Sequence, residues 1–133
     1  MRAALDRIGD RWSLLVVSAL LGGSRRFNDL SVDLGGIAPN VLAQRLRRLE
    51  ADGLIVAEPY SVRPLRYAYA LTATGAALAG ALRLLNHWGA EHGLAQGRGA
   101  LHQACGTAAE PRWFCGTCER MLEDGELDEL LWV

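Results

Sequence analysis

Apolar residues recur at three- and four-residue steps near the start of the chain. Leu5, Ile8 and Trp12 belong to one such stripe, and this period predicts an amphipathic helix over residues 3–21. A glycine pair directly follows and is expected to end that helix. After a short connector, for which an edge strand is one alternative, a second helix is expected over residues 29–34, with Asn28 as its N-cap.

The third predicted helix has one apolar and one polar face. It extends over residues 39–52, begins with Pro39, which suits a first helical position, and ends at Gly53. Leucines at positions 42, 46 and 49 share one face because they are separated by whole helical turns. The opposite face carries polar side chains, and arginines flank it: Asn40, Gln44 and Arg47, with Arg45 and Arg48 at the sides.

The period then changes from that of a helix to that of strands. Residues 54–57 are apolar, and residues 67–71 alternate large and small side chains, which predicts two antiparallel strands joined by a loop at 58–64. Thr72 is expected to cap a last long helix over residues 73–92. The whole pattern predicts a mainly α fold with one small β-hairpin.

Charge and glycine content divide the chain into two parts. The net charge is −1, but residues 1–99 carry 12 arginines and 8 acidic residues, whereas residues 100–133 carry 2 arginines and 7 acidic residues. The body is therefore suited to a polyanion and the tail is not. A glycine-rich linker begins at residue 96, so we expect a body over residues 1–95, and a linker and tail over residues 96–133.

The order of the predicted elements is that of a winged helix-turn-helix. In that fold the polar face of the third helix enters the major groove of double-stranded DNA, and the hairpin, or wing, reaches the neighbouring backbone or minor groove. A solvated basic helix with no ligand is the plainer alternative. The DNA-binding interpretation predicts contacts from one set of residues: Arg25, Arg26, Pro39, Asn40, Gln44, Arg47, Arg48, Arg63 and Arg66.

Several segments resemble the HxlR-type transcriptional regulators. They are ALDRIGDRWSLLV from residue 4, RFNDL from residue 26 and GIAPNVLAQRLRRLEADGLI from residue 36. The wing and the start of the last helix match at Pro64, Arg66, Tyr69, Leu71, Thr72 and Gly75. The resemblance covers residues 4–92. Many members carry a cysteine just before the first helix, and in some of them it senses electrophiles or oxidants. The body of this chain has no cysteine, so sensing by that route is not expected.

The resemblance implies a homodimeric bacterial regulator that binds a roughly palindromic operator. In that family the terminal helices pair the two subunits. Two apolar stripes of this chain suit such a subunit interface. The predicted interface residues are Leu5, Ile8, Trp12, Leu78, Leu82, Leu85 and Trp88.

All three cysteines lie in the tail, in a pattern typical of a zinc knuckle or ribbon. His102 and Cys105 form one pair separated by two residues, and Cys115 and Cys118 form another. Three thiolates and one imidazole complete a tetrahedral shell, so we expect one structural zinc ion per chain with no open position for catalysis. A redox-active Cys115–Cys118 pair, or three plain thiols beside an uninvolved histidine, are the alternatives.

Other features narrow the class of protein. The longest apolar stretch, residues 14–21, is far shorter than a membrane span, and no signal peptide is recognisable, so a soluble cytoplasmic protein is expected. The segment from His87 to His92 lacks metalloprotease spacing, and no catalytic constellation is present. A transcriptional regulator is therefore favoured over a protein-interaction module and over a small thiol oxidoreductase, and the sequence identifies no small-molecule effector.

Overall fold

The computed structural model describes residues 2–94, 101–127 and 130. It divides into two compact units, Met1–Arg83 and Leu84–Val133, which are described separately. Within the described part of the chain, no helix is long and apolar enough to cross a membrane.

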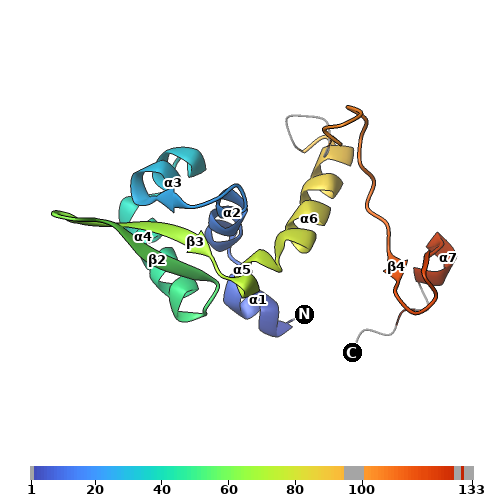
Figure 1. Ribbon diagram of the computed structural model, residues 1–133, viewed down its shortest axis with the longest axis horizontal. Helices are drawn as coiled ribbons and strands as arrows, with labels where there is room; N and C mark the ends of the chain where they lie inside the picture. Colours follow the sequence, from blue (N-terminus) through green and yellow to red (C-terminus); the bar gives the residue numbers. More distant parts are fainter. Residues whose placement is uncertain (1, 95–100, 128–129, 131–133) are drawn as a thin grey trace. The chain divides into compact units, whose positions relative to one another are not determined.

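The first unit is a winged helix-turn-helix (Figure 1). Its three strands form an antiparallel sheet in the order β1-β3-β2, and the β2–β3 hairpin is the wing. The elements are α1 (Arg2–Ile8), α2 (Arg11–Leu20), β1 (Arg25–Arg26), α3 (Phe27–Leu34), α4 (Pro39–Ala51), β2 (Ile55–Val62), β3 (Leu65–Leu71) and α5 (Ala73–Ala76), and α6 (Ala79–Glu91) begins in this unit. The predicted fold class and the predicted edge strand are confirmed.

One hydrophobic core holds α2, α3 and α4 together. The predicted leucine face of α4 is confirmed, because Leu42, Leu46 and Leu49 are buried to within 1% of complete burial. These leucines pack in the same cluster as Leu30 of α3. The other buried members of the cluster are Val16, Val17, Leu20, Ile37, Leu54, Ile55 and Leu82.

The prediction of one helix over residues 3–21 is wrong, because the chain breaks between α1 and α2. Asp10 has extended backbone angles (φ −84°, ψ 146°) and is the N-cap of α2. Its carboxylate accepts hydrogen bonds from the Ser13 amide at 3.1 Å and from the Ser13 hydroxyl at 2.5 Å. Such local bonds compete with a continuous helix. Just before Asp10, the Gly9 amide donates a hydrogen bond to the Leu5 carbonyl, and a side chain at residue 9 would collide with that carbonyl.

The predicted N-cap of the second helix is also wrong. Helix α3 begins at Phe27, and Arg26 is its N-cap residue, whereas Asn28 lies inside the first turn. The carboxylate of Asp29 accepts a hydrogen bond from the Arg26 amide at 3.1 Å, which is the carboxylate half of a capping box.

The predicted loop at 58–64 is largely strand. Pairing continues from Ile55↔Leu71 to Val62↔Leu65, with an irregularity in register between Pro59 and Ser61. A proline can stay in a strand where the ladder is interrupted. The wing is therefore longer than predicted, and Arg63 lies at its tip.

The predicted helix over residues 73–92 is divided into α5 and α6. The predicted cap is confirmed, because the Thr72 hydroxyl accepts a hydrogen bond from the Gly75 amide at 3.1 Å and donates one to the Gly53 carbonyl at 2.6 Å. These bonds hold α5 against the start of the wing. A Cβ at Gly75 would lie only 2.0 Å from the Leu54 carbonyl oxygen, so this position requires glycine.

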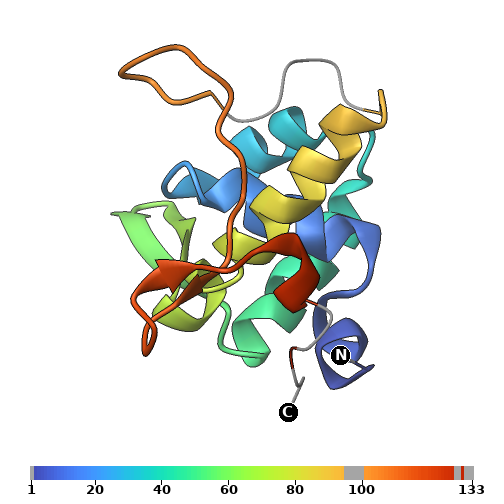
Figure 2. The same cartoon turned by 90° about the vertical axis from the view of Figure 1, so that its right-hand side faces the viewer.

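The second unit contains the end of α6, β4 (Phe114–Cys115), β5 (Arg120–Met121) and α7 (Asp124–Leu127). Strands β4 and β5 form a short antiparallel hairpin (Figure 2, orange to red). Helix α7 is a single turn, and the predicted linker, which begins at residue 96, lies outside the described residues up to residue 100. None of residues 101–127 is buried.

Two glycine substitutions test the packing at Gly75. Gly75→Ala should lower the free energy of unfolding by about 1–3 kcal/mol, because the added methyl group must displace backbone. Gly80→Ala, in α6, is the matched control, since nothing lies within 4 Å of its Cβ position, and it should stabilise by about 0.5–1 kcal/mol. Urea denaturation measures both changes. Equal effects of the two substitutions would contradict the close approach.

Candidate functional site

The exposed face of α4 is the first part of the candidate site. Burial of its leucines turns the opposite side of the helix outward, and Asn40, Gln44 and Arg47 are all exposed. The Arg47 guanidinium lies along the helix and donates to the Ala43 carbonyl at 3.2 Å. Two amides and one guanidinium on one helical face can make bidentate hydrogen bonds to base edges. Pro39 starts this helix as predicted and is also exposed.

Polar contacts join α4 to α1 and to the N-cap of α2. The Arg45 guanidinium lies 3.1 Å from the Asp10 carboxylate. Burial raises the pKa of Asp10, but the hydrogen bonds from Ser13 and the charge of Arg45 outweigh it, so the pKa lies below its ordinary value. Arg48 donates to the Asp6 carbonyl at 2.5 Å and lies 3.9 Å from the Asp52 carboxylate. Arg48, predicted to contact phosphate, therefore has protein partners.

The remaining predicted cations lie near the wing. Arg25 lies 3.4 Å from the Asp33 carboxylate, whereas Arg63 and Arg66 are exposed on the wing. The Arg26 guanidinium stacks over the Tyr60 ring at 4.4 Å.

A polar recess of about 540 Å³ lies between the start of α3 and the wing. Arg26, Arg66, Tyr60 and Tyr67 are among its lining residues. Neither tyrosine is predicted as a site residue by the sequence, because a strand pattern does not reveal which side chains of the hairpin face Arg26. These side chains form a cationic and aromatic surface that extends from the wing to the start of α3.

The predicted dimer residues fall into two groups. Ile8, Trp12 and Leu78 pack against the core of their own chain, and Leu82 is buried in it. The others are exposed: Leu5 of α1 at 55%, and Leu85 and Trp88 of α6 at 53% and 51%.

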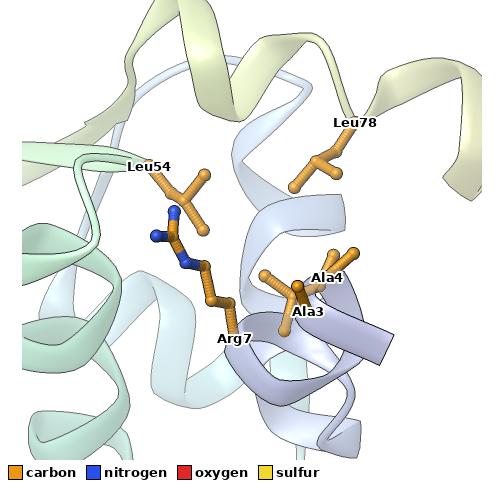
Figure 3. Close-up of a pocket in the computed structure, with 6 residues that line it drawn as sticks. Ala3, Ala4, Arg7, Leu54 and Leu78 are labelled. Carbon is orange, nitrogen blue, oxygen red and sulfur yellow. The ribbon is translucent and has the colours of Figure 1, made fainter. Parts of the chain in front are cut away.

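A recess of about 300 Å³ lies beside α1. Ala3, Ala4, Arg7, Leu54 and Leu78 point toward it (Figure 3). Its lining is mainly apolar, and α1 itself has no buried residue.

The predicted metal ligands form two pairs. His102 Nδ1 lies 3.3 Å from Cys105 Sγ, and the Cys115 and Cys118 thiols are hydrogen-bonded to each other. Among the residues that the structure describes, no three His, Cys, Asp or Glu side chains gather where one ion could bind. The structure thus forms each pair but does not join the pairs.

Hydrogen bonds change the acidity of the three thiols in different directions. Bonds from the Thr107 hydroxyl and amide, and from His102, lower the pKa of Cys105 to about 7. Amide and thiol hydrogen bonds from Cys118, with a further bond from the Thr117 amide, lower the pKa of Cys115. The bond to Cys115, and the charge of that sulfur, raise the pKa of Cys118.

Comparison with known proteins identifies the family. The family model described as HxlR-like helix-turn-helix matches residues 7–96. The chain belongs to the HxlR-like helix-turn-helix family. This HxlR-like chain is therefore a helix-turn-helix transcriptional regulator, and the resemblance inferred from its motifs is confirmed.

Relatives agree with this assignment. An uncharacterized HTH-type transcriptional regulator of Mycobacterium tuberculosis is 40% identical over 119 residues, which cover 86% of this chain and 74% of that protein. The structure of the HTH-type transcriptional regulator ytcD is 36% identical, with a TM-score of 0.65 and coverage of 68% of this chain and 93% of that one. The redox regulator HypR in its reduced form is 31% identical, with a TM-score of 0.65 and coverage of 68% and 90%.

Removal of the Asp10 side chain tests its role as the N-cap of α2 and as the partner of Arg45. Asp10→Ala should lower the free energy of unfolding by about 1–2 kcal/mol, the usual effect of losing an N-cap. Because the pKa of Asp10 is depressed in the folded protein, its contribution is present above the ordinary pKa of about 3.9 and is lost as pH falls through the folded value. The difference between wild type and variant should therefore shrink below about pH 4. Urea denaturation across that range measures it.

Asp33→Ala is the matched control for this experiment. Asp33 forms only a half-exposed ion pair with Arg25, so its removal should change stability by less than about 0.5–1 kcal/mol. A difference for Asp10→Ala that does not vary with pH would contradict the role of the Asp10 carboxylate.

Proposed function

We propose that this HxlR-like regulator acts as a homodimer that binds a roughly palindromic DNA operator through α4 and the wing. The observation that carries the proposal is the exposed polar face of α4, opposite its three buried leucines. Under this proposal the protein is a regulator rather than an enzyme. It then acts in the cytoplasm, at the chromosome.

Side chains on α4 are proposed to read base edges. The amides of Asn40 and Gln44 suit the paired donor and acceptor of adenine, and the Arg47 guanidinium suits guanine or a phosphate. Pro39 lies beside them at the helix N-terminus, which enters the groove first in helix-turn-helix proteins. These four residues are therefore the proposed determinants of sequence preference.

Cations around the wing are proposed to position the protein on the phosphate backbone. Arg26, Arg63 and Arg66 are exposed and suit contacts that add affinity without selecting a base. Arg25 and Arg48 must first leave Asp33 and Asp52, so we propose weaker phosphate contacts for these two.

A second copy of the chain is proposed to cover α1 and the exposed face of α6. Helix α1 has seven residues and no buried residue, and helices of that length are marginal without tertiary packing. Leu5, Leu85 and Trp88 are each more than half exposed. A twofold axis would place each of these two apolar surfaces against a second copy, and the apolar recess beside α1 could receive side chains from that copy.

The DNA proposal is tested on duplexes selected by the wild-type protein from a random library. Gln44→Ala and Arg47→Ala should each lose about 1–3 kcal/mol of affinity for the selected site and relax its sequence preference. Arg63→Ala should weaken binding to all sequences alike and reduce the slope of log K against log salt by about one.

Arg112→Ala is the charge-matched control for these variants. Arg112 lies in the tail beside Glu110, and its removal should leave operator affinity unchanged. Operator binding by all three test variants at the wild-type level would contradict the proposed contacts of α4 and the wing.

The homodimer is tested by sedimentation of the full chain. Wild type should sediment at twice the chain mass of 14.4 kDa. Trp88→Glu should shift it toward the monomer, because a charge would be buried in the interface. Val32→Glu is the control, since Val32 of α3 is 79% exposed and outside the proposed interface. A wild-type monomer at micromolar concentration would contradict the proposal.

A further inference from the structure

The tail contains two tight turns, and each holds a pair of zinc-type ligands. In the first turn, Leu101 pairs with Ala108 as an isolated antiparallel bridge. The His102 amide donates to the Thr107 carbonyl at 2.9 Å, and the Gly106 amide donates to the His102 carbonyl at 2.8 Å. Gly106 has a φ of +69°, which favours glycine. These bonds bring the His102 ring and the Cys105 thiol to one end of the turn.

The second turn repeats this arrangement between β4 and β5. Phe114 pairs with Met121 and Cys115 pairs with Arg120. Amides of Thr117 and Cys118 donate to the Cys115 sulfur. Such amide bonds to a sulfur stabilise the thiolate that a metal requires.

The spacing within the first pair fits a single ion. A histidine nitrogen at about 2.0–2.1 Å and a cysteine sulfur at about 2.3 Å from a tetrahedral zinc ion lie about 3.5 Å from each other. The observed distance between His102 Nδ1 and Cys105 Sγ is 3.3 Å. A thiol and an imidazole at this distance need little movement to accept the metal.

The tail has no hydrophobic core that could hold the two turns together. None of residues 101–127 is buried, and Phe114 and Met121 remain 58% and 57% exposed. Residues 109–113, which connect the turns, form no helix or strand. Segments of this size are usually stabilised by a metal or by disulfides.

We propose that His102, Cys105, Cys115 and Cys118 bind one structural zinc ion per chain, which draws the two turns together. The turns supply half of a tetrahedral shell each, and binding releases the protons of the thiols. A shell filled by four side chains leaves no position for a substrate, so the ion stabilises the tail and performs no catalysis. The proposal is independent of the proposed DNA contacts.

Two further observations support this ligand set. Two of the tail carboxylates have cationic partners, since Glu126 pairs with Arg120 and Glu110 pairs with Arg112. The mycobacterial relative aligns over 86% of this chain, more than the body alone could supply, so part of the tail is shared with that protein.

The test is elemental analysis of the full-length protein, purified under reducing conditions without added metal. One zinc ion per chain is expected. Replacement by Co²⁺ should give the visible bands of a tetrahedral site and the near-ultraviolet charge-transfer band of thiolate ligands. Cys105→Ser, Cys115→Ser, Cys118→Ser and His102→Asn should each weaken Co²⁺ binding beyond the roughly 10–100-fold typical of losing a supporting contact around a metal site.

His92→Asn is the matched control, because His92 lies at the end of α6 and bonds to the Trp88 carbonyl. It should leave metal content and Co²⁺ affinity unchanged. Chelation of the wild type should remove hydrogen-exchange protection from residues 101–122 while protection of α4 persists, so failure of the metal site and failure of the winged helix are distinguishable.

Three results would overturn the proposal. The first is protein without metal whose three thiols react as fast as in denaturant. The second is one ion per two chains, which would indicate a site shared between copies. The third is a Cys115–Cys118 disulfide that forms reversibly in protein that binds no Co²⁺, which would make the pair a redox site.

Discussion

The burial of one leucine face of α4 is the interaction on which the rest of the winged helix depends. Leu42, Leu46 and Leu49 are almost completely excluded from solvent in the cluster that joins α2, α3 and α4. Full burial of a leucine contributes about 1.5–3 kcal/mol, so three of them fix the rotation of α4 about its axis. The same rotation exposes Asn40, Gln44 and Arg47. Packing and the candidate DNA-reading surface are therefore two consequences of one helical period.

Polar contacts fix the ends of the helices that hydrophobic burial packs together. Asp10 caps α2 and also pairs with Arg45 of α4, so one carboxylate both begins α2 and contacts α4. At the other end of the unit, Thr72 and Gly75 fasten α5 to the start of the wing. These contacts are short-range and directional, and they determine where helices break rather than which face they bury.

The tail is ordered by different interactions from those that order the body. It buries no side chain among residues 101–127, and its order rests on turn hydrogen bonds and on a two-residue β-hairpin. Hydrophobic collapse cannot specify such a segment, whereas the proposed zinc ligation would. Under that proposal, the metal holds the tail in one conformation, as the buried leucine face holds the body.

The sequence by itself determined the order of elements, the buried leucines of α4, its exposed polar face and the Thr72 cap, because periodicity and turn chemistry are local. The break after Ile8 rests on local bonds between Asp10 and Ser13, which the helical period does not reveal. Only the tertiary structure decided the contact of Asp10 with Arg45 and the close approach of the Leu54 carbonyl to Gly75, because both join residues far apart in the sequence. It also decided that Trp12 and Leu82 pack within their own chain, and that Arg48 has protein partners. A helical stripe gives the direction of a side chain from the helix axis, but not whether its neighbour is the same chain, a second copy or DNA.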